Sequence, residues 1–258
     1  MNYFKSLVKS IYNSQCGIWL RNKVGFRPVK IILPNHLSNY SVSDAFFWRT
    51  DGGYVTYFRF YDIPKMYFDM EGTRVRFIFF GHNGRVLKEF ELDEIQTFNE
   101  LVINKEFLNG LQDYGTFSVF HVFDDKDRSD VKIINRHYVG FSKNNGIPSF
   151  VHGNIYARYW NPKTNKIMSD MVLISSKPTI YVVQKNFISY DYIELFFSNP
   201  TTKQIWATVT GQKIFLNSGE SIILQVEPVN VVRIISNCCF LRPLIFTESN
   251  GYFDCLHA

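Results

Sequence analysis

Histidines offer the clearest acid–base and metal chemistry in this sequence: His121, His137, His152 and His257 lie in or beside runs that predict strands. An imidazole titrates near neutral pH, and its neutral form binds metals. His257 stands two positions after Cys255, so both side chains would lie on the same face of a strand. This placement makes them a candidate pair of metal ligands. A structural zinc site needs four ligands, and no such set is evident. We therefore predict no metal and no cofactor, and a hydrogen-bonding role for these imidazoles stays open.

Acid–base catalysis at His152 or His257 would require a second polar group, for which Asp254 and Arg136 are the candidates. This combination predicts, as an alternative to a binding protein, an enzyme that modifies a sugar or nucleotide-sugar intermediate. The usual signatures of enzymes are missing: the chain has no phosphate-binding glycine loop, no H-E-x-x-H, no G-x-S-x-G and no C-x-x-C.

A second chemical candidate is the run Trp48 to Gly53, which sets Trp48, Arg49 and Asp51 beside two glycines. An indole can stack on a sugar ring while charged groups bind its hydroxyls, and Trp160 has similar neighbours. The alternative is that both tryptophans pack in the core. The predicted ligand-binding residues are Trp48, Arg49, Asp51, Arg136, His137, Asn145, His152, Trp160, Asn250, Asp254 and His257.

The elements that must position these residues are strands. From residue 44 onward the chain is rich in Phe, Tyr, Val, Ile and Thr, and it alternates in residues 54–60. Residues 74–92 predict a hairpin, because Asn83-Gly84 joins two apolar runs. Long amphipathic helices are missing between the runs, which excludes a parallel α/β sheet. The sequence predicts an all-β protein built from two β-sandwich units.

A faint internal repeat supports two units. Residues 139–152 match residues 244–257 at a constant offset of 105, each with an Asn-Gly pair and a final histidine. Asp44-Ala45-Phe46-Phe47 is echoed by Glu194-Leu195-Phe196-Phe197. An internal duplication would explain both matches. The predicted organisation is a basic N-terminal segment at 1–40, a first β-sandwich domain at 41–154 and a second at 155–258.

The positive charge of the chain belongs to that N-terminal segment. The full sequence carries 28 basic and 23 acidic residues, a net charge of +5. Six of the basic residues precede Asp44, the first acidic residue, so the remainder is close to neutral. A nucleic-acid-binding domain would spread its cations over a folded face, and we therefore predict no nucleic-acid partner.

Residues 3–12 place Phe4, Leu7, Val8 and Ile11 at helical spacing between lysines. This pattern predicts either a short helix packed on the body or a peripheral membrane contact through residues 1–30. Lysines interrupt any secretory signal, and the four cysteines are too irregular for a disulfide framework. We expect a cytoplasmic protein, with the inner membrane as the surface that residues 1–30 would contact.

Five segments carry a family resemblance: SVSDAFFWRTDGGYVTYFRFYDI (41–63), GTFSVFHVF (115–123), VGFSKNNGIPSFVHGN (139–154), ELFFSNPTTK (194–203) and SNCCFLRPLIF (236–246). They resemble an uncharacterised bacterial family of β-rich proteins that accompany enzymes of surface-polysaccharide (O-antigen or capsule) biosynthesis. The resemblance covers residues 41–258 and implies a cytoplasmic partner in making or modifying such glycans. It implies no catalytic residue, because that family has no established activity.

Taken together, these features predict a non-catalytic β-sandwich accessory protein that binds a carbohydrate, a glycan intermediate or a glycan-assembly protein. The first alternative is the enzyme with a His/Asp site described above. The second is a structural homo-oligomer whose sheet edges pair between subunits.

Overall fold

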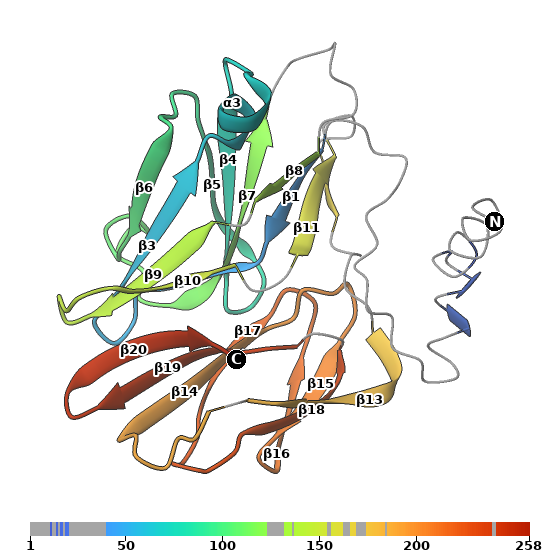
Figure 1. Ribbon diagram of the computed structural model, residues 1–258, viewed down its shortest axis with the longest axis vertical. Helices are drawn as coiled ribbons and strands as arrows, with labels where there is room; N and C mark the ends of the chain where they lie inside the picture. Colours follow the sequence, from blue (N-terminus) through green and yellow to red (C-terminus); the bar gives the residue numbers. More distant parts are fainter. Residues whose placement is uncertain are drawn as a thin grey trace.

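The computed structural model confirms that the chain is mostly β (Figure 1). It describes residues 40–122, 132–135, 137–153, 156–161, 166–168, 174–183, 185–238 and 241–258, together with 11, 14, 16, 17, 19 and 20. Most of the basic segment 1–40, with its predicted membrane contact, and the candidate Arg136 lie outside the described residues. No helix in the described part of the chain is long and apolar enough to cross a membrane.

The described strands form five four-stranded sheets, named A to E here. Sheet A runs in the order β12 (Lys166–Met168), β11 (Tyr156–Asn161), β1 (Tyr40–Asp44), β8 (Lys132–Asn135). Sheet B runs β2 (Phe46–Arg49), β7 (Tyr114–Val122), β4 (Arg74–Gly81), β5 (Val86–Leu92). Sheet C runs β10 (Ser149–His152), β9 (Tyr138–Lys143), β3 (Tyr54–Tyr61), β6 (Phe98–Ile103).

The second half of the chain supplies the other two sheets. Sheet D runs in the order β13 (Ile174–Val182), β18 (Arg233–Cys238), β15 (Ile205–Val209), β16 (Gln212–Leu216). Sheet E runs β17 (Ser221–Gln225), β14 (Tyr192–Ser198), β19 (Leu244–Ser249), β20 (Tyr252–His257). Neighbouring strands pair antiparallel in all five sheets, apart from the parallel pair β1 and β8.

A short helix, α3 (Ile63–Phe68), follows β3. Its N-terminus is capped by Asp62, whose carboxylate accepts a hydrogen bond from the Lys65 amide at 3.1 Å. Pro64 lies in its first turn, where a missing N–H costs nothing. The predicted hairpin at residues 74–92 is present as β4 and β5, with Gly84 at φ 75° in its turn.

Sheet E explains why the predicted pair of separate β-sandwiches is wrong. One of its faces packs on sheet D through Leu195 and Phe197, and its other face adds Phe196 and Phe246 to the core of sheets B and C. Sheets B, C, E and D are therefore arranged as a propeller-like ring. Figure 1 shows C at upper left, B beside it, E at lower left and D at lower right. Because sheet E serves two cores, neither half is closed on its own.

The two halves nevertheless share one topology. Counted along the chain, the eight strands β2–β7, β9 and β10 have the order 1-6-3-4 in sheet B and 5-2-7-8 in sheet C. The eight strands β13–β20 have the same orders in sheets D and E. An internal duplication predicts this identity of strand order. The shorter sequence match, between residues 44–47 and 194–197, does not join equivalent strands of the two halves. Residues 46 and 47 lie in β2, an edge strand of sheet B, whereas residues 194–197 lie in β14, an inner strand of sheet E.

Candidate ligand-binding face

The predicted sugar-stacking cluster around Trp48 is part of the core. The Trp48 side chain has 0% exposure, and its Nε1 donates a hydrogen bond to the Phe80 carbonyl at 2.9 Å. Arg49 is also buried and binds two carboxylates, those of Asp51 (Nε to Oδ1, 2.7 Å) and Glu194 on β14. The Arg49–Glu194 pair therefore ties sheet B to sheet E, and the buried Trp48 cannot reach a ligand.

The Arg49 guanidinium stays charged in this environment. Burial alone would lower its pKa, but the hydrogen bonds and charges of Glu194 and Asp51 outweigh burial and raise it. The guanidinium also stacks 4.0 Å from the ring centroid of Tyr54. The cluster is thus a satisfied structural ion pair between the two halves of the chain.

His137 is a core residue as well. It lies against the rings of Phe58 and Phe60, and its Nε2 is 3.3 Å from Asn135 Oδ1, the atom that His121 Nδ1 approaches at 2.5 Å. Burial lowers the pKa of His121 to about 4, although its hydrogen bonds act in the opposite direction. Burial, and then the neighbouring His121, lowers the pKa of His137 well below its usual range. Both imidazoles are therefore neutral at physiological pH.

The predicted polar residues at turns also have structural roles. Asn145 and Asn250 adopt left-handed backbone angles (φ 60° and 51°), which asparagine tolerates in tight hairpin turns. The backbone N–H of Asn250 donates a hydrogen bond to the Asp191 carboxylate at 2.8 Å. Trp160 is half buried on sheet A and packs against the cluster of Phe80 and Phe120 on sheet B.

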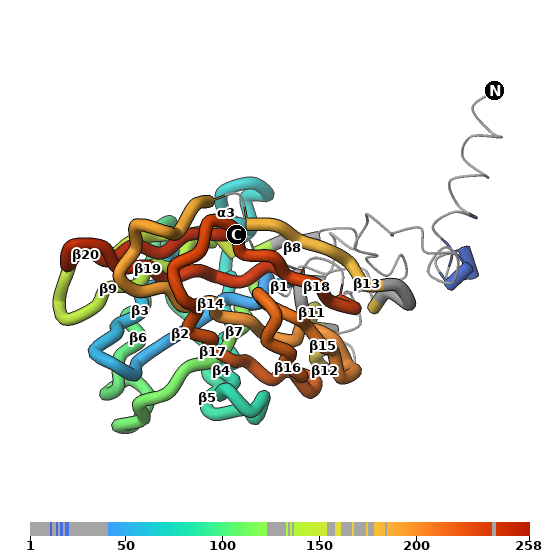
Figure 2. The backbone as a smooth tube through the Cα atoms, turned by 90° about the horizontal axis from the view of Figure 1, so that it is seen from below, coloured from blue at the N-terminus to red at the C-terminus, as the bar shows by residue number. Residues whose placement is uncertain are grey.

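The two matching hairpins meet each other, as Figures 1 and 2 show for β9 and β20. Phe141 packs edge-on against Phe246, with ring centroids 5.0 Å apart, and these positions are 105 residues apart. The same separation relates Lys143 to Glu248, which form an ion pair, and Ser149 to Asp254, which form a hydrogen bond of 2.7 Å. Equivalent positions therefore contact each other across a local pseudo-twofold axis.

His152 and His257 stack at this junction, with ring centroids 4.4 Å apart. His257 Nε2 hydrogen-bonds to the His152 carbonyl, and His152 Nδ1 lies 2.7 Å from the Gly153 carbonyl. The Asp254 carboxylate accepts its hydrogen bond from Ser149 Oγ rather than orienting either imidazole. The repeat predicted only that these two histidines occupy equivalent positions, and their contact is a finding of the structure. Asp254 bonds to Ser149 and not to either imidazole in the predicted His/Asp site.

Cys255 and His257 do not form a metal pair either. Burial raises the pKa of the Cys255 thiol to about 12, so it remains protonated, and its Sγ donates to the Ser149 carbonyl at 3.1 Å. No group of three or more His, Cys, Asp or Glu side chains suited to a metal ion occurs in the described part of the chain.

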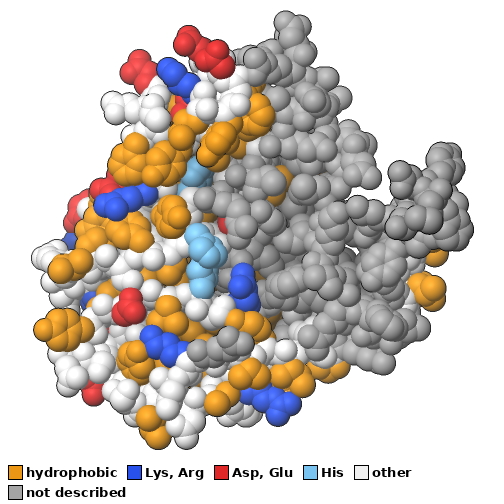
Figure 3. All heavy atoms as spheres, viewed as in Figure 1, with side chains coloured by type: hydrophobic (Ala, Val, Ile, Leu, Met, Phe, Trp, Pro, Cys, Tyr) orange, Lys and Arg blue, Asp and Glu red, His pale blue; other side chains and the backbone are white. Residues whose placement is uncertain are grey.

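The outer face of sheet C carries a set of side chains that the sequence reading did not single out. Tyrosine and phenylalanine rings surround one ion pair there, and Figure 3 shows them gathered over β3, β6 and β9. We call this surface the aromatic face. Its members are Tyr57, Arg59, Tyr61, Phe98, Glu100, Tyr138, Phe150 and His152.

Strand register brings these residues together in rows. One row across the sheet joins His152, Tyr138, Arg59 and Glu100, which are direct cross-strand partners. Arg59 Nε donates to Glu100 Oε2 at 2.7 Å, so the cation of this row is neutralised. Tyr138 is 51% exposed at the centre of the row.

The adjoining row shows why Gly140 is a glycine. The Phe150 ring lies flat over it, and a Cβ at Gly140 would be 2.5 Å from Phe150 Cε1. Arg59 stacks on the same ring at 4.1 Å from its centroid. At the end of the face, Tyr61 and the 47% exposed Phe98 meet edge-on with centroids 5.5 Å apart. The aromatic face is therefore held by packing before any ligand arrives.

A signal for this face was present in the sequence. In residues 54–61 every second side chain is buried, and the intervening positions hold Tyr57, Arg59 and Tyr61. The alternation predicts the strand, but it does not by itself mark the tyrosines on its outer side as a site. Phe98, Tyr138 and Phe150 come from other strands, and only the sheet order places them alongside.

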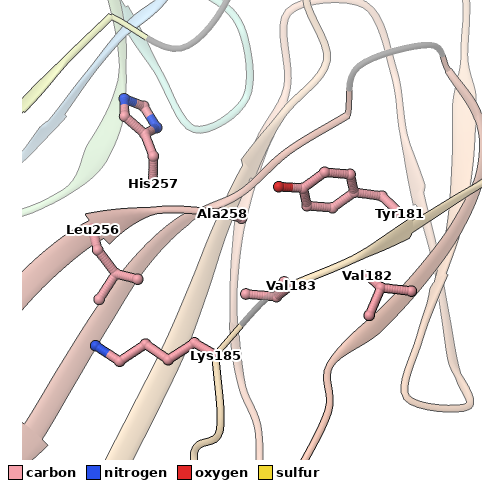
Figure 4. Close-up of a pocket in the computed structure, with 7 residues that line it drawn as sticks. All are labelled: Tyr181, Val182, Val183, Lys185, Leu256, His257 and Ala258. Atoms are coloured by element: carbon pink, nitrogen blue, oxygen red, sulfur yellow. The ribbon is translucent and has the colours of Figure 1, made fainter.

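A pocket of about 360 Å³ lies near the histidine stack. Its lining consists of Tyr181, Val182, Val183, Lys185, Leu256, His257 and Ala258. Figure 4 shows the Tyr181 hydroxyl and the His257 ring on one side and the Lys185 side chain on the other. Because His257 stacks on His152, this pocket adjoins the end of the aromatic face.

No protein-family model and no curated protein matches this chain.

Proposed function

We propose that the protein is a non-catalytic carbohydrate-binding protein whose ligand lies on the aromatic face. In keeping with the family resemblance, its role would be that of a cytoplasmic accessory protein in surface-polysaccharide biosynthesis. The observation that carries the proposal is the row His152, Tyr138, Arg59 and Glu100, flanked by exposed rings on one sheet face.

The chemistry of this face suits a sugar chain. A pyranose presents C–H groups on its flat faces, which pack on aromatic rings such as Tyr138 and Phe98, and hydroxyls at its edges. Arg59 and Glu100 supply a donor and an acceptor side by side, and His152 adds a third polar group at the end of the row. Apolar contact combined with a few fixed polar groups is the usual composition of a small-molecule site.

A single-stranded nucleic acid would also stack on such rings, but it requires uncompensated cations along its backbone. Arg59, the cation at the centre of the face, is paired with Glu100. The charge balance therefore favours a neutral ligand. No observation favours the enzymatic alternative, because Asp254 is bound to Ser149, and the homo-oligomer stays a prediction that light scattering would test.

Isothermal titration calorimetry with a panel of neutral and acidic oligosaccharides tests the proposal. Tyr138→Ala removes the central exposed ring, and we expect roughly fivefold weaker binding, since an aromatic contact is worth about 1 kcal/mol. Tyr252→Ala is the matched control, because Tyr252 is 81% exposed on β20, outside this face, and should bind normally. Equal affinity of Tyr138→Ala and the wild type, or no binding of any oligosaccharide, would refute the proposal.

A further inference from the structure

The outer face of sheet D, like that of sheet C, is left open by the part of the chain that the structure describes. Its outward side chains are aliphatic, aromatic and cationic, and we call it the cationic face. It comprises Ile180, Val182, Trp206, Lys213, Phe215 and Arg233, with Ile235 at its centre. Along the lower margin of Figure 3, hydrophobic side chains lie next to a basic one.

Register shows that these residues form one patch. Ile180 and Ile235 are cross-strand partners, and Ile235 is in turn opposite Thr208, whose partner on β16 is Lys213. Trp206 is opposite Phe215, which is 55% exposed. The apolar side chains therefore run continuously from β13 to β16.

The charges on this patch have a single sign. Lys213 lies 4.9 Å from the Phe215 ring centroid and Arg233 is exposed, whereas the outward positions described in β13, β18, β15 and β16 contain no Asp or Glu. The aromatic face differs, since Glu100 neutralises Arg59 there. An apolar patch with unbalanced cations attracts a partner that is both apolar and anionic.

The equivalent surface elsewhere in this chain is covered. Sheet B has the same strand order as sheet D, and its outer side chains Ile78, Phe80 and Phe120 pack under Trp160 and Ile167 of sheet A. No described element covers sheet D in the same way, because Ile180 and Val182 are each 45% exposed.

Two occupants from the protein itself are disfavoured by charge. Residues 1–43 contain six basic and no acidic residues, so this segment would be repelled by Lys213 and Arg233. A second copy that docks through the same face would set like charges against each other. Both cationic regions would instead be attracted to one extended anionic surface.

We infer that the cationic face binds the surface of an anionic phospholipid bilayer. Lys213 and Arg233 would pair with lipid phosphates, and Trp206 and Phe215 would lie at the headgroup level, where aromatic rings are favoured. Figure 1 places sheets C and D at opposite corners of the ring, so a bilayer on sheet D leaves the aromatic face uncovered.

Co-flotation of the full chain with vesicles tests this inference. Vesicles of equal parts phosphatidylglycerol and phosphatidylcholine should bind the protein at low salt, and pure phosphatidylcholine vesicles should not. Lys213→Gln/Arg233→Gln should weaken binding roughly thirtyfold, since each cation near an anionic surface contributes about 1 kcal/mol. Phe215→Ser should also weaken binding, and the emission of tryptophan should shift to the blue on binding in the wild type and in every variant that still binds.

Matched controls isolate the face. Lys203→Gln, an exposed lysine outside sheet D, and Tyr138→Ala on the aromatic face should bind vesicles as the wild type does. No binding to the anionic vesicles overturns the inference, and so does unchanged binding of Lys213→Gln/Arg233→Gln. Binding that is lost only in Lys5→Gln/Lys9→Gln would assign the contact to the N-terminal segment, which also overturns it. An oligosaccharide titration of the same samples reports on the aromatic face independently.

Discussion

The outer faces of sheets C and D are built by the same alternation of strands but differ in what they present. The aromatic face has tyrosines and an internally neutralised ion pair, whereas the cationic face has aliphatic side chains and cations without carboxylates. Tyrosine with balanced polar groups suits a neutral, hydroxylated ligand, and Trp, Ile and Lys suit an apolar, anionic surface. One backbone architecture therefore presents two chemically different faces, and the balance of side-chain charge distinguishes them.

The two faces also differ in the hydrophobic cores that lie beneath them. The aromatic face lies over a core that includes Phe58 and Phe141 and receives Phe246 from the second half. The cationic face lies over a core formed by second-half residues alone. Three perturbations should show whether the two cores unfold as one cooperative unit, and they are given from the largest expected effect to the smallest.

Removal of the buried ion pair between the halves should have the largest effect. Glu194→Ala leaves the Arg49 guanidinium buried without its main partner, and we expect the free energy of unfolding to fall by about 3–5 kcal/mol. Both faces should fail together, so oligosaccharide and vesicle binding should be lost at the same urea concentration.

The exposed pair on sheet C supplies the control. Glu100→Ala breaks an ion pair whose side chains are about one-third or more exposed, and its cost should stay below about 1 kcal/mol. If Glu194→Ala costs no more than Glu100→Ala, or if the two faces are lost at different urea concentrations, the halves do not depend on each other.

Acid should act on the half that carries the aromatic face. His121 and His137 have lowered pKa values in the folded protein, so the unfolded chain takes up protons first as the pH falls below about 6.5. Stability is therefore full above this pH and falls progressively as the pH drops below it, because the unfolded chain binds protons at these two positions and the folded protein does not. Urea unfolding at pH 7, 6 and 5 measures the slope.

A variant in which an aromatic ring without a titrating group replaces His137 sharpens this measurement. His137→Phe should reduce the slope, because the ring at this position lies among Phe46, Phe58 and Phe60 and needs no proton. His152→Gln, at an exposed position, should leave the slope as it is. An unchanged slope in His137→Phe would show that other groups control the acid sensitivity.

The smallest expected effect concerns the order of the aromatic face alone. Gly140→Ala places a methyl group 2.5 Å from the Phe150 ring, which must tilt away and disturb its stack with Arg59. We expect a loss of about 1 kcal/mol in stability, as for other overpacked positions, and weaker oligosaccharide binding. Vesicle binding should be unchanged, and an equal loss in both assays would contradict the independence of the two faces.

Local structure was largely readable from the sequence. The alternation in residues 54–61 became β3, the Asn-Gly signal became the β4–β5 hairpin, and the repeat at an offset of 105 became two hairpins in equivalent positions. These features depend on side-chain period and turn chemistry, which act over a few residues. The equivalence of His152 and His257 follows from the same repeat, whereas the contact between their rings is seen only in the structure.

The candidate site was readable only in part. Trp48 and Arg49 sit beside a flexible turn in the sequence, yet both are buried: Trp48 donates to the Phe80 carbonyl within sheet B, and Arg49 pairs with Glu194 on β14 of the other half. Local pattern cannot show which sheet covers a strand. For the same reason the aromatic face could not be predicted from the sequence, because its rings come from four strands that are far apart in the chain.

The sequence by itself determined that this is an all-β protein with a repeated hairpin, because alternation and turn residues encode strands locally. Only the tertiary structure decided that four sheets form a ring with sheet E serving two cores, and that the outer faces of sheets C and D remain open. The physical reason is that burial is a property of the packed sheets. A tyrosine or tryptophan is equally suited to a core and to a binding face, and the sheet that packs on it, or fails to, decides which role it has.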